Sequence, residues 1–200
     1  MVRRSLLILM LCLYQPGAWA DQPSILILGD SLSASYGMSE AEGWVKKLQQ
    51  NLPDAQIINA SVSGETSGGG LRRLPGLLQQ HQPDWVFVEL GGNDGLRGFQ
   101  PTITENNIEQ LITLSKASGA QVLLSEVMVP PNYGRRYAER FQQIYHGLAK
   151  EHEVELVPFF MTEIATDPNL MQADGIHPNR EAQGRIAAFL LPWFEQAIAE

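Results

Sequence analysis

Three side chains in this sequence have the chemistry of a nucleophile, a general base and an orienting acid. Ser31 stands in Gly29-Asp30-Ser31-Leu32-Ser33, and Asp174 precedes His177 in Asp174-Gly175-Ile176-His177. A serine hydroxyl is a weak nucleophile at its own pKa and needs a base beside it. If one oxygen of Asp174 accepts the Nδ1 hydrogen of His177, Nε2 is free to take the proton of Ser31. The three residues therefore predict acyl transfer through a covalent intermediate.

Two glycine-containing segments offer donors for the oxyanion that acyl transfer creates. Ala60-Ser61-Val62-Ser63-Gly64 presents the amide of Gly64, which can approach a ligand closely because glycine has no Cβ. Gly91-Gly92-Asn93-Asp94 presents the side-chain NH2 group of Asn93. Taken alone, each candidate also fits a structural role. Ser31 could cap a helix, Asp174 and His177 could be a hydrogen-bonded loop pair, and the two glycine segments could be ordinary turns.

Five short runs of branched apolar residues, separated by segments with helical spacing, must position these groups. The runs span residues 24–28, 56–59, 85–90, 121–127 and 154–157. Their length and composition are typical of buried parallel strands. Strands that alternate with helices predict an α/β protein, a three-layer α/β/α sandwich around a five-stranded parallel sheet.

The candidate residues all follow predicted strands. Ser31, Gly64 and Asn93 come directly after the first three strands, and the Asp174–His177 segment lies between the fifth strand and the last helix. Because the carboxyl ends of parallel strands share one edge of the sheet, where ligands bind, we expect these residues to meet there.

Helix boundaries depend on local signals. Ser39 and Glu42 have the spacing of a capping box, which predicts that the first helix begins at Ser39. The segment 67–81 contains Pro75, which predicts either a kink or a late start, and Pro192 raises the same question for the last helix, expected from about Asn179.

The four blocks, in this order, resemble those of the GDSL or SGNH hydrolase family: Ser31, Gly64, Asn93 and His177 stand at the block positions. Segments 90–99, 132–137 and 174–179 are most similar to the small exported bacterial esterases of that family. The resemblance implies a flavodoxin-like sandwich, no metal and no organic cofactor. It also implies hydrolysis of carboxylic esters and thioesters of acyl chains, including aryl esters, lysophospholipids and acyl thioesters, with an oxyanion hole of Ser31, Gly64 and Asn93.

Other function classes are less consistent with the residues but stay open. An α/β-hydrolase elbow would have glycine where Ser33 stands. A carbohydrate-ester deacetylase would use the same catalytic residues in a shallow polar cleft. A non-catalytic flavodoxin-like binder of nucleotide or flavin is the third alternative, although no Gly-x-Gly-x-x-Gly or Walker-type lysine motif follows the first strand.

Four apolar or aromatic residues lie in the segments after the third and fourth strands. Leu96, Phe99, Tyr133 and Tyr137 are therefore predicted to wall a groove for the acyl chain, the alternative being that these segments pack back on the sheet. The expected partners are small-molecule acyl esters or lysophospholipids.

The first twenty residues have the pattern of a secretory signal peptide: Arg3 and Arg4, an apolar run over 6–13, and Ala18-Trp19-Ala20. The run is shorter than the roughly 20 residues of a membrane-spanning helix. We expect an exported protein, periplasmic or released, whose residues 21–200 form one domain and a monomer. Since Cys12 lies in the signal segment, the mature chain would have no disulfide.

The chain is acidic, with 14 Lys and Arg against 22 Asp and Glu and a formal net charge of −8. Such a surface repels phosphate backbones, and this argues against nucleic-acid binding.

Overall fold

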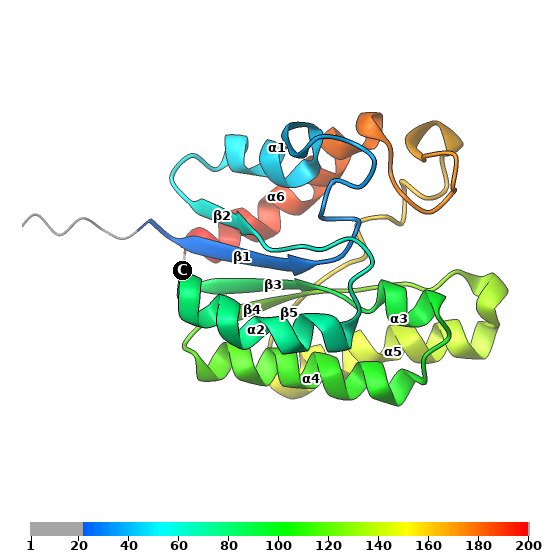
Figure 1. Ribbon diagram of the computed structural model, residues 1–200, viewed down its shortest axis with the longest axis horizontal. Coiled ribbons are helices and arrows are strands. Elements are labelled where there is room, and N and C mark those ends of the chain that lie inside the picture. The colour runs from blue at the N-terminus through cyan, green and yellow to red at the C-terminus, as the bar shows by residue number, and fades with distance from the viewer. Residues whose placement is uncertain (1–21, 200) are drawn as a thin grey trace, which may run out of the picture.

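A five-stranded parallel sheet forms the centre of the molecule, with helices on both of its faces (Figure 1). The computed structural model describes residues 22–199, so the predicted signal peptide and Cys12 lie outside the described residues. The strand order β2-β1-β3-β4-β5 is that of the flavodoxin-like doubly wound fold, and the predicted three-layer sandwich is confirmed. The strands are β1 (Ser24–Gly29), β2 (Gln56–Asn59), β3 (Trp85–Glu89), β4 (Gln121–Ser125) and β5 (Glu155–Val157).

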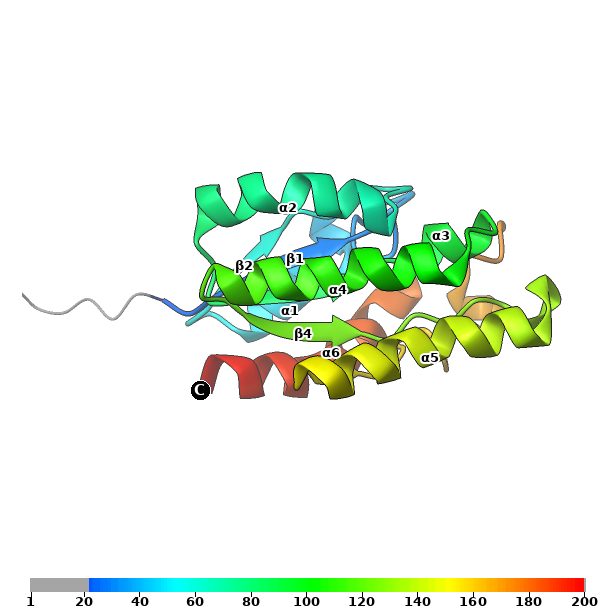
Figure 2. The same ribbon diagram turned by 90° about the horizontal axis from the view of Figure 1, so that it is seen from below.

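The helices divide between the two faces of the sheet. One face is covered by α1 (Trp44–Asn51) and α6 (Gln183–Ala199), which contact each other. Seen from below in Figure 2, α2 (Ser67–His81), α4 (Pro101–Ala117) and α5 (Arg135–His152) lie side by side across the other face. Shorter elements occur in the connections: α3 (Gly92–Leu96) and the 3₁₀ turns η1 (Glu40–Glu42), η2 (Pro131–Tyr133), η3 (Pro168–Leu170) and η4 (Arg180–Ala182).

The central strand β1 supplies side chains to two separate cores, because successive residues of a strand point to opposite faces. Ile25 and Ile27 pack with the α1 and α6 side, whereas Leu26 and Leu28 pack with the α2, α4 and α5 side. All four are fully buried. Burial on both faces explains why the strand has a continuous apolar run and no polar alternation.

The predicted start of the first helix at Ser39 is wrong by about one turn. The Glu42 carboxylate accepts hydrogen bonds from the amide and the hydroxyl of Ser39, at 3.1 and 2.9 Å, but this pair closes only the 3₁₀ turn η1. Gly43 is extended, with φ −67° and ψ 157°, and α1 begins after it at Trp44. A Cβ atom at Gly43 would clash with the Ser35 hydroxyl, so close approach of the chain to itself explains the glycine at this position.

Neither proline delays its helix. Pro75 lies inside α2, which starts at Ser67, where the Thr66 hydroxyl accepts the Gly69 amide at 3.1 Å. Pro192 lies inside α6. The Asn179 side chain accepts the amides of Glu181 and Ala182 at 2.9 and 3.3 Å, starting η4, which leads directly into α6. Over residues 22–199, no helix combines the length and apolar character that crossing a membrane requires.

Candidate active site

Ser31, His177 and Asp174 form a continuous hydrogen-bonded chain at the carboxyl edge of the sheet. The Ser31 Oγ atom lies 2.9 Å from His177 Nε2, although the two residues are 146 positions apart. On the other side of the ring, His177 Nδ1 lies 2.7 Å from Asp174 Oδ2. This order of atoms lets the imidazole donate its Nδ1 hydrogen to the carboxylate and accept the serine proton at Nε2.

The loop that carries Asp174 and His177 is organised by the carboxylate itself. Asp174 Oδ1 accepts the amides of Ile176 and His177, at 2.9 and 3.0 Å. Gly175, which directly follows Asp174, has φ +66°, a left-handed conformation that glycine adopts at little cost. Hydrogen bonds lower the pKa of Asp174 to about 2. The largest effect comes from the His177 amide, followed by the His177 side chain and the Ile176 amide. The carboxylate is therefore ionised at neutral pH and can orient the imidazole.

Tyr36 contacts the predicted base, and the sequence contained no signal for it. Its ring stacks on that of His177, and its carbonyl oxygen accepts the Gln172 side-chain amide at 2.8 Å. Gln172 also donates its backbone amide to the His177 carbonyl, at 2.8 Å. These contacts join the segment after Ser31 to the loop of His177.

The loops of Gly64 and Asn93 lie next to each other. Gly64 has φ +78°, and its carbonyl oxygen accepts a hydrogen bond from the Arg97 guanidinium at 2.9 Å. Asn93 lies in α3, where Gly91, with φ +114°, lets the chain turn sharply after β3. The Asn93 side-chain NH2 donates to Asp30 Oδ2 at 3.0 Å, so this carboxamide is held beside the turn that contains Ser31.

A second network anchors the same loops to the helices below. Asp94 is fully buried and accepts the amide of Ser67 at 2.8 Å, together with the Ser67 hydroxyl. The Thr104 hydroxyl donates to the same carboxylate at 3.3 Å. Asp94 therefore ties the start of α2 and the start of α4 to the loop of Asn93.

Two buried carboxyl groups lie beneath the nucleophile turn. Asp30 and Glu89 are 3% and 1% exposed. Burial raises the pKa of Asp30 to about 6, against the opposing effects of the Leu32 amide and the Asn93 side chain. Burial and then the charge of Asp30 raise the pKa of Glu89 well above its usual range.

An apolar cavity of about 290 Å³ opens beside these groups. The polar side chains that line it are those of Asp30, Ser31, Glu89, Asn93 and His177, and Gly64 is not among its lining residues. Its apolar lining consists mainly of residues from the segments after β1, β3, β4 and β5: Leu32, Leu96, Val127, Met128, Pro130, Phe159, Met161, Ala165, Met171 and Ile176.

Of the four residues predicted to contact an acyl chain, Leu96 lines this cavity and Phe99, Tyr133 and Tyr137 do not. The Tyr137 hydroxyl donates to the Phe99 carbonyl at 2.8 Å, which packs the chain after α3 against α5. Methionine and phenylalanine side chains that follow β4 and β5 also line the cavity and were not predicted from the sequence. Their position after the carboxyl ends of predicted strands was the available signal.

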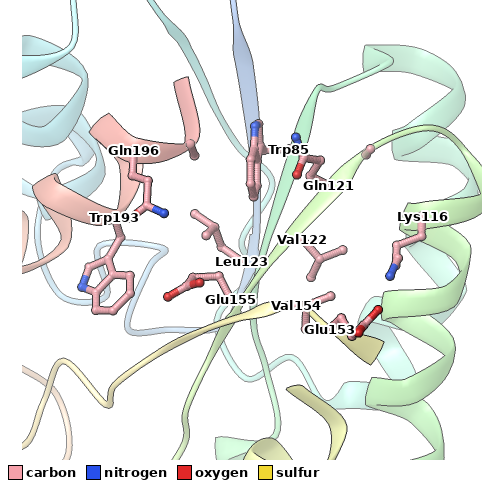
Figure 3. Close-up of a pocket in the computed structure, with 12 residues that line it drawn as sticks. Trp85, Lys116, Gln121, Val122, Leu123, Glu153, Val154, Glu155, Trp193 and Gln196 are labelled. Atoms are coloured by element: carbon pink, nitrogen blue, oxygen red, sulfur yellow. The ribbon is translucent and has the colours of Figure 1, made fainter. Parts of the chain in front are cut away.

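A separate cavity of about 340 Å³ lies among the starts of β3, β4 and β5, at the edge of the sheet opposite Ser31 (Figure 3). Trp85, Gln121 and Glu155 stand at the amino ends of these strands, and Trp193 reaches the cavity from α6. None of the candidate catalytic residues lines it. Elsewhere, on α4 and α5, the ligand atoms of Glu109, Glu151 and His152 lie within 4.8 Å of one another, also away from the catalytic residues.

The chain is similar to known ester-hydrolysing enzymes. Residues 27–185 match the model of the GDSL-like Lipase/Acylhydrolase family. It is 54% identical over 172 residues to "Thioesterase 1/protease 1/lysophospholipase L1" of Escherichia coli, covering 86% of this chain and 83% of that protein. It is 46% identical over 194 residues to the arylesterase of Vibrio mimicus, covering 95% and 96% of the two chains.

A solved structure of the psychrotrophic esterase EstA from Pseudoalteromonas sp., inhibited by monoethylphosphonate, superimposes with a TM-score of 0.86 at 44% identity. The match covers 88% of this chain and 99% of that one. The family predicted from the four sequence blocks is thus confirmed. The chain belongs to the GDSL-like lipase and acylhydrolase family and is an ester-hydrolysing enzyme.

Proposed function

We propose that Ser31 is the nucleophile of a serine esterase that hydrolyses esters and thioesters of acyl chains through an acyl-enzyme. The observation that carries the proposal is the 2.9 Å contact between Ser31 Oγ and His177 Nε2 beside an apolar cavity. A base at this distance from a hydroxyl can take its proton as the hydroxyl attacks a carbonyl carbon.

The reaction proceeds in two halves. Ser31 Oγ attacks the acyl carbonyl carbon while His177 Nε2 takes the hydroxyl proton, and Asp174 stabilises the imidazolium that forms. His177 then returns this proton to the leaving alcohol or thiol, which leaves an acyl ester on Ser31. In the second half, water attacks the acyl carbon with His177 again as base, and the carboxylic acid departs as the Ser31 hydroxyl is restored.

The developing oxyanion needs fixed donors. In this proposal they are the amides of Ser31 and Gly64 and the NH2 group of Asn93. The Asp30 carboxylate occupies one hydrogen of the Asn93 NH2 group and leaves the other free for the oxyanion. Removal of one such donor typically costs about 10²- to 10³-fold in rate.

The lining of the cavity favours acyl chains over carbohydrate esters. Beyond the polar residues around Ser31, its walls are formed by aliphatic, methionine and phenylalanine side chains, which bind a hydrocarbon chain and offer few groups to sugar hydroxyls. Methionine side chains are flexible and can adapt to chains of different length. We propose aryl esters, lysophospholipids and acyl thioesters as substrates, since the named relatives are an arylesterase and a thioesterase and lysophospholipase.

The pattern of residues 1–20 supports export, with residues 21–200 as a single-domain, monomeric mature enzyme in the periplasm or released from the cell. Acyl-CoA is a cytoplasmic metabolite. Outside the inner membrane, lysophospholipids and fatty or aryl esters are then the substrates that the enzyme meets.

The test is a series of p-nitrophenyl esters from acetyl to palmitoyl, hydrolysed by the mature protein, by Ser31→Ala and by Ser118→Ala as a control at the end of α4. We expect turnover that increases with chain length beyond acetyl and disappears only in Ser31→Ala. Turnover confined to acetyl would favour a carbohydrate deacetylase, and equal turnover by Ser31→Ala would exclude Ser31 as the nucleophile. A colourless protein with no turnover would leave the binding-protein alternative, without bound flavin.

A further inference from the structure

The two buried carboxyl groups both form hydrogen bonds with the nucleophile turn, to which Asp30 itself belongs. Glu89 is the last residue of β3 and lies in register with Gly29 of β1. Its Oε2 atom accepts the Ser33 hydroxyl at 2.7 Å and the Asp30 amide at 3.2 Å. A Cβ atom on Gly29 would lie 2.7 Å from this oxygen, so glycine is required where the carboxyl group passes under the turn.

Asp30 has donors at both of its carboxylate oxygens. Oδ1 accepts the Leu32 amide and Oδ2 accepts the Asn93 side chain, each at 3.0 Å. Glu89, by contrast, has its protein donors on one oxygen among the described residues. Protein donors therefore stabilise a negative charge on Asp30 better than on Glu89.

The surroundings of the pair contain little positive charge to balance two ionised carboxylates. The titratable groups that face Asp30 from other elements are His177 in the loop before η4 and Asp94 in α3, and Tyr145 of α5 faces both carboxyl groups. Among residues 22–199, neither Asp30 nor Glu89 has a salt-bridge partner within 4 Å. Two neighbouring buried carboxyl groups without a cation do not both ionise readily, so one of them keeps its proton.

We propose that Asp30 and Glu89 act as a pair of positioning residues for the oxyanion hole, with Asp30 ionised and Glu89 protonated. The inference rests on the proposed function, because it concerns the donor role of Asn93. An ionised carboxylate only accepts hydrogen bonds, so it pairs with the NH2 end of the Asn93 carboxamide and excludes the flipped orientation. A flipped amide would direct its oxygen toward the oxyanion and repel it.

Glu89 has a different part in the pair. As a neutral acid it still accepts the Ser33 hydroxyl and the Asp30 amide, which holds the turn without adding a second negative charge near the oxyanion. Its protonation leaves the single charge on Asp30, beside the Asn93 carboxamide.

The first test replaces Asp30 by Asn, whose carboxamide can pair with either end of Asn93. We expect kcat to fall by about 10- to 100-fold with KM little changed, since the loss concerns a contact to the transition state. In wild type, protonation of His177 abolishes activity and protonation of Asp30 lowers it, so log(kcat/KM) falls with a slope steeper than one over part of the acid range. This slope becomes one throughout in Asp30→Asn. The matched control Asp54→Asn, which changes an exposed residue before β2, keeps the steeper slope of the wild type.

A slope steeper than one in Asp30→Asn would overturn the assignment of the charge to Asp30, and a change in KM in place of kcat would overturn its role toward the transition state. The second test compares Glu89→Gln with Glu89→Leu, which have similar size but differ in the acceptor oxygen. We expect Glu89→Gln to be at least about tenfold more active than Glu89→Leu, because the turn needs the acceptor and not the acid. Equal activity of the two would contradict the acceptor role of Glu89. Glu89→Gln is also expected to stay within about tenfold of wild type, because it keeps a neutral acceptor. A larger loss would contradict a neutral Glu89, and this measurement is decisive if Asp30→Asn does not fold.

Labelling with a phosphonate ester separates failure of this inference from failure of the proposed function. Mass spectrometry of the inactivated wild type is expected to locate the adduct on Ser31. An adduct elsewhere would refute the catalytic assignment itself. An adduct on Ser31, with unchanged slopes in Asp30→Asn, would refute only the positioning role.

Discussion

The ring of Tyr36 stacks on the imidazole of His177, with centroids 4.1 Å apart and planes inclined by 29°. Tyr36 is 46% exposed, so it covers the base from the solvent side without being part of a core. A stacked ring restricts rotation of the imidazole.

Tyr36→Ala is expected to lower kcat/KM by about 3- to 10-fold, which corresponds to the roughly 0.5–1.5 kcal/mol of an aromatic pair. Tyr36→Phe keeps the ring and is expected to stay within about twofold of wild type. Steady-state kinetics on a p-nitrophenyl ester would measure both. A Phe variant as impaired as the Ala variant would assign the effect to the hydroxyl and not to stacking.

Ser31→Ala and His177→Ala are each expected to remove nearly all activity, by about 10⁴- to 10⁶-fold in kcat, because nucleophile and base act as one unit. The double variant is then expected to be within about tenfold of either single one. Additive losses in the double variant would mean that the two side chains act independently.

Met128→Glu is expected to reduce the preference for long acyl chains, since it places a charge in the apolar lining of the cavity. Each buried methylene contributes about 0.8 kcal/mol, so the octanoyl-to-acetyl ratio of kcat/KM should fall by at least about tenfold. The control is Ile103→Glu, which alters a residue of similar exposure on α4, 49% against 41%. A ratio that is unchanged in Met128→Glu would place the acyl chain elsewhere.

The buried Asp30 is expected to make folding stability depend on pH. Its pKa rises from 3.8 to about 6 in the folded protein, so the native state binds its proton more tightly than the unfolded state. The associated stability is present below pH 4 and is lost as the pH rises through 6. The free energy of unfolding of wild type, minus that of Asp30→Asn, should therefore decrease by up to about 3 kcal/mol between pH 4 and 7. Urea titrations at several pH values would measure it, and a difference independent of pH would contradict the raised pKa.

Asp94→Ala is expected to destabilise the fold by about 3 kcal/mol, because it leaves the buried donors of Ser67 and Thr104 without their acceptor. Asp94→Asn keeps one acceptor oxygen and should lose less. Urea denaturation would compare the variants, and a loss below about 1 kcal/mol in Asp94→Ala would mean that water replaces the carboxylate.

The sheet, and the meeting of the candidate catalytic residues at one of its edges, could be predicted from the sequence because both follow from short apolar runs. Strands buried on both faces need continuous apolar runs such as Ile25–Leu28, and a parallel sheet brings the residues after those runs to one edge. The start of the first helix was predicted wrongly because the capping signal of Ser39 and Glu42 is satisfied by a single 3₁₀ turn, and the extended Gly43 separates this turn from α1.

By itself, therefore, the sequence determined the layers of the fold, the family and the candidate catalytic residues, since these follow from short-range periodicity and from four local motifs. Only the tertiary structure decided that Tyr36 stacks on His177, that Glu89 lies under Asp30, and that Leu96 faces the cavity while Tyr137 packs against the chain after α3. Each of these relations joins segments far apart along the chain. Their distances depend on how helices and loops pack on the sheet, and no local pattern of residues specifies that packing.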